Sequence, residues 1–244
     1  MKSAYTKSIV RITSCLNNRP EFGSGFIIRY SKGSTYVVTC AHVIRDIGGS
    51  SKVRIGENHD EVEVVATGSS SFDVAVLKVK KQFEECVPLS VCLSCEEGER
   101  FVICGWRQFA GQFVTTTSVY GRLTLLGDTE EKNHRAETYS FEVENPDKNL
   151  LDDGCSGAPV INEKNGCVAG IVLQKIDQGR KGICISINAV TKICPELYSL
   201  NDESELKLRT MKISELLVSK RKIDEALRNE IKQIKVLRSR LDRQ

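Results

Sequence analysis

No run of apolar residues in this sequence approaches the ~18 that a membrane-spanning helix needs, and the N-terminal segment MKSAYTKSIVRIT lacks the apolar run of a signal peptide. We therefore expect a cytoplasmic protein with no membrane partner. Internal repeats and low-complexity segments are also missing. The 244 residues, of which 40% are hydrophobic and 27% are charged, suit a globular protein with a well-buried core.

Clustered positive charge is scarce as well. The net charge of +3 comes from residues 201–244, because Lys and Arg are balanced by Asp and Glu in residues 1–200. Nucleic-acid enzymes usually carry a basic stripe interleaved with aromatic residues, and aromatic residues make up only 6% of this chain. We therefore expect no nucleic-acid partner.

The sequence holds ten cysteines, but few of them stand at the spacing that is typical of a metal site. Most of them lie inside apolar runs such as Phe101–Gly105, which is typical of buried free thiols. Cys92 and Cys95 form a CxxC pair, with no second pair at zinc-ribbon spacing. A zinc site at this pair is an alternative, but core packing is the better interpretation, so we expect no metal and no cofactor.

Short runs of β-branched and aromatic residues fill residues 7–195, broken by Gly, Ser, Asn and Asp. Among the expected strands are GSGFIIRY, TYVVTC, EVEVVAT, QFVTTTSVY and TYSFEV. This texture predicts an all-β fold. About a dozen runs with a break near residues 92–99 suit two barrels of about six strands each, although strand count alone does not distinguish barrels from sandwiches. The barrels are expected at about residues 1–95 and 96–195 of a domain that ends at residue 200.

Residues 201–244 differ from the rest because they contain no Gly or Pro and many good helix formers. Apolar residues recur there at intervals of three and four, which predicts a helix with one apolar stripe on a charged surface. That stripe needs burial. It could pack on the body of the protein, form a short coiled coil, or dock onto a partner protein, so this extension is a candidate for self-association or regulation.

A general base is easy to search for, because the sequence has only three histidines, His42, His59 and His134. Histidine is the usual base because it titrates near neutrality. His59 and His134 stand in polar, turn-like segments that predict exposed side chains without a special role. His42 follows the apolar run YVVTC and belongs to AHVIRD, which is expected to be a short apolar turn. This places His42 at the end of a strand, where a site could form.

A nucleophile and an orienting carboxylate also have candidates. Ser156 stands between Gly154 and Gly157, and glycines there allow a tight turn that aims the Gly154 and Ser156 amides at one point. An ordinary hairpin loop would fit the same residues. Asp73 opens the apolar run DVAVLKV, where an unpaired carboxylate would be costly, so a hydrogen bond from the His42 ring would stabilise it.

Six motifs give these candidates a family context: GSGFII, VVTCAHVI, DVAVLKV, GCSGAPV, GCVAGIVL and GICISINAV. Their order resembles that of trypsin-like serine peptidases, especially the minimal bacterial branch that includes the HtrA-type proteases. The resemblance covers roughly residues 7–195. It implies a chymotrypsin-like double six-stranded β-barrel with a C-terminal α-helical extension, and a serine endopeptidase that acts on protein or peptide substrates.

The resemblance also assigns roles to residues. It makes His42 the general base, Asp73 its orienting group and Ser156 the nucleophile, with the Gly154 and Ser156 amides as the oxyanion hole.

Substrate contacts follow from the same resemblance. Gly170, Ile171 and Val172 would form the edge to which an extended substrate adds as a strand. Leu150 would lie at the base of the primary specificity pocket, which hints at a small or apolar side chain before the cleaved bond.

The sequence departs from its relatives at several points. Cys155 precedes the nucleophile where digestive and clotting relatives have an aspartate that pairs with a freshly cut N-terminus, so we expect regulation through loops, assembly or a partner. Val43 replaces the cysteine that commonly follows the histidine in secreted members. No PDZ module follows the protease region. Cys155 as nucleophile is a weaker alternative, because it stands one position before the expected register.

Two other classes of function stay open. The barrels could be a catalytically silent scaffold that binds peptides and recruits a partner through the helical extension. The extension could itself be the main functional part, as an arm for oligomerisation or docking.

Overall fold

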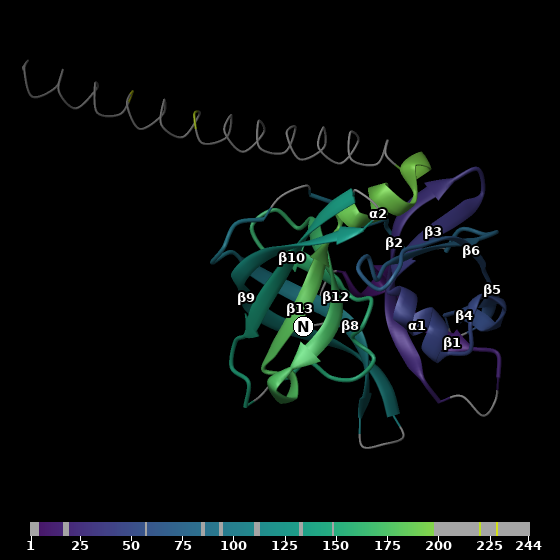
Figure 1. The fold of residues 1–244 in the computed structure, drawn as a ribbon, viewed down its shortest axis with the longest axis horizontal. Coiled ribbons are helices and arrows are strands. Elements are labelled where there is room, and N and C mark those ends of the chain that lie inside the picture. The colour runs from purple at the N-terminus through teal and green to yellow at the C-terminus, as the bar shows by residue number, and fades with distance from the viewer. Residues whose placement is uncertain are drawn as a thin grey trace, which may run out of the picture. The chain divides into compact units, whose positions relative to one another are not determined.

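The structure is a computed structural model that describes residues 5–16, 20–56, 58–83, 86–92, 95–109, 113–131, 134–147 and 149–197, together with Lys220 and Arg228. The chain divides into two units, Met1–Asp202 and Glu203–Gln244. The numbered strands and helices all belong to the first unit (Figure 1). The helix predicted for residues 201–244 lies outside the described residues, apart from Lys220 and Arg228, which are both helical.

The first half of the unit folds into a seven-stranded antiparallel sheet with the order β5-β4-β1-β2-β3-β7-β6 (Figure 1). Its strands are β1 Ile9–Ser14, β2 Phe22–Ser31, β3 Ser34–Thr39, β4 Val53–Ile55, β5 Asp60–Glu61, β6 Glu63–Thr67 and β7 Ala75–Val79. In β1 the buried Ile12 alternates with the partly exposed Arg11 and Thr13, as expected for a strand with one face in the core.

The second half closes into a six-stranded barrel with the order β10-β13-β12-β11-β8-β9. Its strands are β8 Arg100–Phe109, β9 Phe113–Glu131, β10 His134–Val143, β11 Pro159–Asn162, β12 Val168–Ile176 and β13 Lys181–Ser186. Strands β9 and β10 form a hairpin whose pairing continues to Glu131 and His134. His134, predicted to be turn-like, is therefore the first residue of a strand, although its side chain is exposed as expected.

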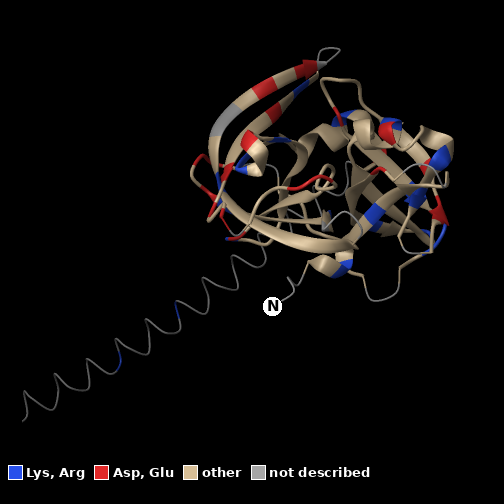
Figure 2. Cartoon of the chain, turned by 90° about the horizontal axis from the view of Figure 1, so that it is seen from below, with Lys and Arg blue, Asp and Glu red and all other residues tan. Residues whose placement is uncertain are grey.

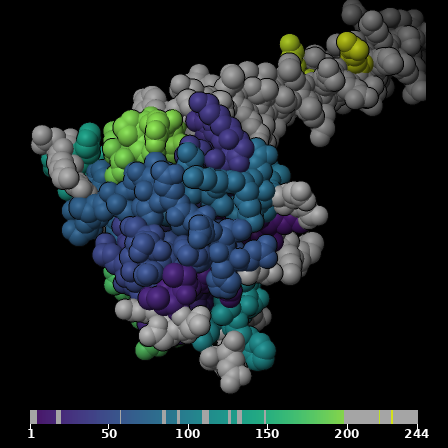
Figure 3. Space-filling view, turned by 90° about the vertical axis from the view of Figure 1, so that its right-hand side faces the viewer, coloured from purple at the N-terminus to yellow at the C-terminus, as the bar shows by residue number. Residues whose placement is uncertain are grey.

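Short helices join these strands. They are α1 Ala41–Asp46, α2 Asn188–Ile193 and the 3-10 helices η1 Thr6–Ser8, η2 Ser50–Lys52, η3 Asp177–Gly179 and η4 Pro195–Leu197. The segment 41–46, predicted as a turn, is thus helical, because Ala41, Val43 and Ile44 bury one side of it. Helix α2, light green in Figure 3, lies beside the blue first half, and its buried Ala189 and Val190 join the core of that half.

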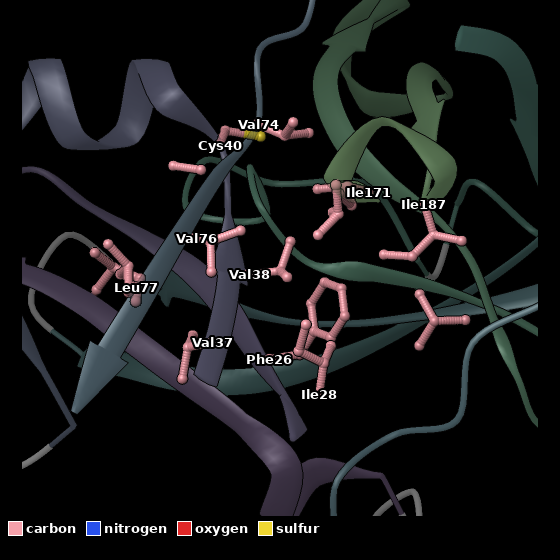
Figure 4. Packing of buried hydrophobic residues seen from close by; sticks show 14 of the residues in the cluster. Phe26, Ile28, Val37, Val38, Cys40, Val74, Val76, Leu77, Ile171 and Ile187 are labelled. Atoms are coloured by element: carbon pink, nitrogen blue, oxygen red, sulfur yellow. The ribbon is translucent and has the colours of Figure 1, made fainter. Parts of the chain in front are cut away.

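One hydrophobic core runs across both halves of the unit. Phe26, Val38 and Val76 of the first sheet belong to the same buried cluster as Ile171 and Ile187, and Figure 4 shows these side chains together. Burying a side chain of this size contributes roughly 1.5–3 kcal/mol. A shared core of this kind resists relative movement of the two sheets, and so it steadies any site built between them.

The double β-barrel predicted from the resemblance is confirmed, with one correction to the strand count. The second barrel has the expected six strands, but the first sheet has seven. The run EVEVVAT, predicted as one strand, is split at Val62 into β5 and β6, and these pair with different neighbours, β4 and β7.

Figure 2 marks Lys and Arg in blue and Asp and Glu in red along the ribbon, and the described residues include both signs of charge. None of the helices in the described ranges has the length and apolar character needed to cross a membrane.

Candidate active site

His42 and Asp73 are held together by two hydrogen bonds. His42 Nδ1 lies 2.5 Å from Asp73 Oδ2, and the His42 backbone amide donates to Asp73 Oδ1 over 2.8 Å. Because an ionised carboxylate only accepts, the first contact places the ring proton on Nδ1 and leaves Nε2 as an acceptor. The side chains are 24% and 15% exposed, so the pair is shielded from water but still reachable.

The elements around this pair explain its position. His42 is in the first turn of α1, directly after β3, and Asp73 stands two residues before β7. Strands β3 and β7 are neighbours, with Thr39 paired to Ala75, so the two side chains meet at the same end of the sheet. Arg45, one turn further along α1, adds a positive charge 3.9 Å from Asp73 Oδ1, but its side chain is mostly exposed.

Ser156 sits in a tight loop between β10 and β11. The Cys155 amide closes a turn by donating to Asp152 O over 3.2 Å. Gly154 has a φ of +92° and Gly157 a φ of +84°, a region of backbone space that favours glycine. A side chain at Gly157 would also overlap the Ser24 carbonyl, so the loop requires glycine there.

The carbonyl of Val172 joins the Ser156 loop to the strand that leads to His42. It accepts from the Gly157 amide over 2.8 Å and from the Cys40 thiol over 3.1 Å. Gly157 follows Ser156 directly, and Cys40 stands two residues before His42. The structure therefore brings the three predicted residues into one region between the two halves of the fold.

The Ser156 hydroxyl itself donates to Leu173 O over 3.2 Å. Within the described part of the chain it makes no hydrogen bond to His42. From Gly154 to Gly157, the Cys155 and Gly157 amides donate to backbone carbonyls, whereas the Gly154 and Ser156 amides donate to none among the described residues. These two amides are the ones predicted to form the oxyanion hole.

The predicted substrate edge needs correction. Ile171 pairs with Pro159 of β11 on one side and with Ile185 of β13 on the other, and Gly170 is likewise paired on both sides. Val172 completes this pattern through its bonds with Gly157 and Ala158. Residues 170–172 are thus interior to the sheet, and the prediction that they form an edge is wrong.

The part of β12 that has a partner on one side only begins at Leu173. Gln174, Lys175 and Ile176 pair with β13, and within the described ranges no strand pairs with their other side. Lys175 Nζ forms an ion pair with Asp153 Oδ1 over 2.7 Å, which links this stretch to the loop that carries Ser156.

Leu150 precedes the same loop and is half-buried. Its neighbour Leu151 is 2% exposed and packs in the core of the second barrel. The Leu151 amide donates to Gly179 O over 2.9 Å, so this segment is fixed against η3. The role of Leu150 in a specificity pocket stays a prediction.

Cys155 lies beside Ser156 but is buried, and its thiol contacts Trp106 O at 3.7 Å. Burial raises the pKa of the Cys155 thiol to about 12. A thiol in this state holds its proton at neutral pH, and the thiolate is the nucleophilic form. The environment of Cys155 therefore opposes the alternative of a cysteine nucleophile.

The ten cysteines, all of them described, are thiols rather than disulfides, and seven of them are buried. A hydrogen bond between Cys92 and Cys95 lowers the pKa of Cys92 and raises that of Cys95. Among the described residues this pair is joined by no third ligand close enough to share a metal ion.

Cys40, His42 and Asp73 are the group of potential ligands that does come together, with their ligand atoms within 4.8 Å of one another. Two ligands of one tetrahedral zinc ion lie about 3.3 Å apart, whereas His42 Nδ1 and Asp73 Oδ2 are 2.5 Å apart. Their geometry is that of a hydrogen bond. Burial, followed by the charge of Asp73, also raises the pKa of the Cys40 thiol well above its usual range, which opposes the thiolate that zinc prefers.

Within the described ranges, neither of the other two histidines hydrogen bonds to His42, Asp73 or Ser156. His59 is in an exposed turn, where Thr13 Oγ1 is 3.4 Å from its Nδ1, and His134 is exposed at the start of β10.

The sequence reasoning missed two residues that the structure brings to the site, Ser24 and Leu173. Ser24 lies between two glycines in β2, and glycines inside a strand often mark a close approach of another backbone. That signal could have identified Ser24. Nothing local in the sequence identifies Leu173, because its role depends on where β11 ends.

Comparisons with known proteins show the family and the fold of the chain. The family model described as Trypsin-like peptidase domain matches residues 23–171. Serine proteases described as HtrA-like, from two strains of Staphylococcus epidermidis, are 28% identical to the chain over 212 residues. The match covers 78% of this chain and 35% of those proteins, so the chain spans about a third of their length.

Solved structures show the same fold. The active form of the Rv3671c protease from M. tuberculosis has a TM-score of 0.59 and 25% identity, covering 78% of this chain and 80% of that one. An inactive form of Rv3671c gives a TM-score of 0.59 with 23% identity, covering 80% and 89%. The sequence predicted both the double-barrel fold and the family, and the chain belongs to the family of proteins with a trypsin-like peptidase domain.

Proposed function

We propose that this chain cleaves peptide bonds in selected protein substrates through an acyl-enzyme, with His42, Asp73 and Ser156 as its catalytic triad. The observation that carries the proposal is the double hydrogen bond between His42 and Asp73. It fixes both the orientation of the imidazole ring and the nitrogen that carries the proton.

The chemistry follows from that tautomer. His42 Nε2 accepts the proton of the Ser156 hydroxyl as Ser156 Oγ attacks the substrate carbonyl carbon, and the Asp73 carboxylate stabilises the imidazolium that forms. The amides of Gly154 and Ser156 donate to the carbonyl oxygen, which becomes an oxyanion. His42 then gives its proton to the departing amine as the peptide bond breaks. Water, activated in the same way, releases the acyl group and restores Ser156.

Substrate binding is proposed along β12 from Leu173 to Ile176. An extended peptide would add there as a further strand, because main-chain groups of a sheet edge pair with any sequence. Lys175, within this stretch, forms an ion pair with Asp153 of the loop that carries Ser156. A small or apolar residue before the cleaved bond, suggested by Leu150, is part of the proposal.

A cytoplasmic location, and control through residues 201–244, complete the proposal. The apolar stripe of that segment would bind a regulatory protein or a second copy of the chain. Light scattering of the full chain tests self-association: the double change Leu227→Asp and Ile231→Asp should lower the mass of an assembly, whereas the charge change Lys232→Glu should not. An unchanged monomeric mass in all three proteins would reject self-association.

Cleavage profiling tests the enzyme itself. The full chain and its Ser156→Ala variant are incubated with a proteome-derived peptide library, and new termini are counted by mass spectrometry. We expect cuts with a common residue preference that are absent with Ser156→Ala. Equal cutting by both proteins, or binding of peptides without cutting by either, would favour the scaffold function and reject the proposal.

A further inference from the structure

Ser24 belongs to the first sheet but bonds to the loop that carries Ser156. It lies in β2 and is fully buried, at 0% exposure. Its hydroxyl donates to Gly154 O over 2.6 Å, and its backbone amide donates to Ser156 O over 2.9 Å. One residue of the first half therefore holds two carbonyls of the Ser156 loop.

The first of these bonds fixes a complete peptide unit. The carbonyl of Gly154 and the amide of Cys155 belong to the same planar group. Ser24 Oγ holds the carbonyl, while the Cys155 amide donates to Asp152 O over 3.2 Å. Rotation of this peptide would break both bonds, so its orientation is determined from two sides.

The next two peptides are held as well. The Cys155 carbonyl accepts from the Ala158 amide over 2.9 Å. The Ser156 carbonyl accepts from β2, and the following Gly157 amide donates to Val172 O over 2.8 Å. This pattern engages every carbonyl from residue 154 to 156, and no backbone acceptor in the described part of the chain binds the Gly154 or Ser156 amide.

The Ser24 side chain is itself fixed. Its hydroxyl accepts from the Trp106 amide over 2.8 Å while it donates to Gly154 O. The Ser24 carbonyl accepts from Thr39 Oγ1 over 2.7 Å. A buried hydroxyl with both a donor and an acceptor partner has one favourable orientation, so it is suited to hold another group in place.

We propose that Ser24 is a positioning residue, whose hydroxyl orients the peptide between Gly154 and Cys155 so that the Gly154 and Ser156 amides stay available to an oxyanion. The inference rests on the proposed function of Ser156. Cys155 cannot form an ion pair that would order the loop, because its thiol is buried against Trp106 O. Gly154 needs an external restraint, since glycine adopts several backbone conformations with little cost.

Ser24→Ala tests this role because it removes the hydroxyl and keeps the backbone bond to Ser156. A fluorophosphonate places its phosphoryl oxygen where a substrate oxyanion would lie, so its rate of reaction reports on the two amides. We expect the limiting rate of labelling at saturating probe to fall about 10- to 100-fold, somewhat less than the direct loss of an oxyanion donor. The pH dependence of the rate should keep its midpoint, because the His42–Asp73 pair is unchanged.

Ser8→Ala is the matched control. Ser8 is also buried, its hydroxyl donates to Val87 O over 2.5 Å, and among the described residues this hydroxyl makes no hydrogen bond to the loop that carries Ser156. It should lower the melting temperature without slowing labelling. Ser24→Cys, which keeps a weak donor of similar size, should label at a rate between those of wild type and Ser24→Ala.

The outcomes separate this inference from the proposed function. Labelling of wild type and loss of labelling in Ser156→Ala establish the nucleophile. With that result, a Ser24→Ala rate within about twofold of wild type would overturn the positioning role, as would equal losses in Ser24→Ala and Ser8→Ala. Equal labelling of wild type and Ser156→Ala would reject the proposed nucleophile instead.

Discussion

The Ser156 hydroxyl donates to the carbonyl of Leu173 over 3.2 Å, at the point where β12 loses its partner on one side. To attack a substrate, the hydroxyl has to leave Leu173 and turn toward His42. Exchanging one ordinary hydrogen bond for another changes the free energy by about 1 kcal/mol. This contact is therefore a small barrier, and a substrate strand that pairs with Leu173 would compete for the same carbonyl.

Asp73→Asn should slow labelling by a fluorophosphonate about 10⁴-fold. The asparagine amide keeps the shape of the side chain, but it can donate to His42 Nδ1, which moves the ring proton to Nε2. His42 then cannot accept the proton of Ser156. The rate constant for labelling is the measurement. Asp46→Asn, at an exposed position at the end of α1, the helix that carries His42, is the control and should leave the rate unchanged.

Cys155→Ala should keep the rate of fluorophosphonate labelling within about fivefold of wild type. It should lower the free energy of unfolding by about 1 kcal/mol, because the thiol fills a small space in the core. Labelling kinetics and urea unfolding provide the two measurements. Loss of labelling in Cys155→Ala, together with normal labelling in Ser156→Ala, would show that the cysteine is the nucleophile.

Stability should fall in alkaline solution, partly through Cys155. Burial raises the pKa of this thiol from 9.0 to about 12, so between these values the folded state keeps a proton that the unfolded state has lost. The free energy of unfolding then decreases as pH rises, by up to about 1.4 kcal/mol per pH unit for this group. The stabilisation by the Cys155 thiol is complete below its pKa in the unfolded state. It is lost as the pH rises through its pKa in the folded state.

Urea unfolding at pH 7.5 and pH 10 isolates the effect. Between the two pH values, the free energy of unfolding of Cys155→Ala should fall by about 1 kcal/mol less than that of wild type. Cys15→Ala, which changes an exposed thiol, should show the same decrease as wild type. An equal decrease in the free energy of unfolding in all three proteins would contradict the raised pKa of Cys155.

The sequence predicted the strands best where side chains alternate or form short apolar runs. GSGFIIRY and TYVVTC became β2 and β3 with small shifts at their ends. The length of the β9–β10 hairpin was underestimated. Its far end, around Glu131 and His134, is held by backbone pairing, and the sequence there is polar. Periodicity has no apolar face to detect there.

The side chains of the candidate site were easier to predict from the sequence than the strand pairing and backbone hydrogen bonds around them. His42, Asp73 and Ser156 stand in local patterns that restrict the choice, and the structure brings them to one region. The misplaced edge at Gly170–Val172 has a different cause, since only the register of β11 against β12 decides which residues are paired on both sides. The bond from Ser24 to Gly154 spans 130 positions, a relationship that a single sequence does not reveal.

Mass-spectrometric mapping of the fluorophosphonate adduct tests the central claim most directly. The full chain is labelled, digested and sequenced, with Ser156→Ala treated in parallel. A single adduct on Ser156, absent from the variant and slowed by Asp73→Asn, is the result that the triad predicts. An adduct on Cys155 or on another serine, retained in Ser156→Ala, would contradict it.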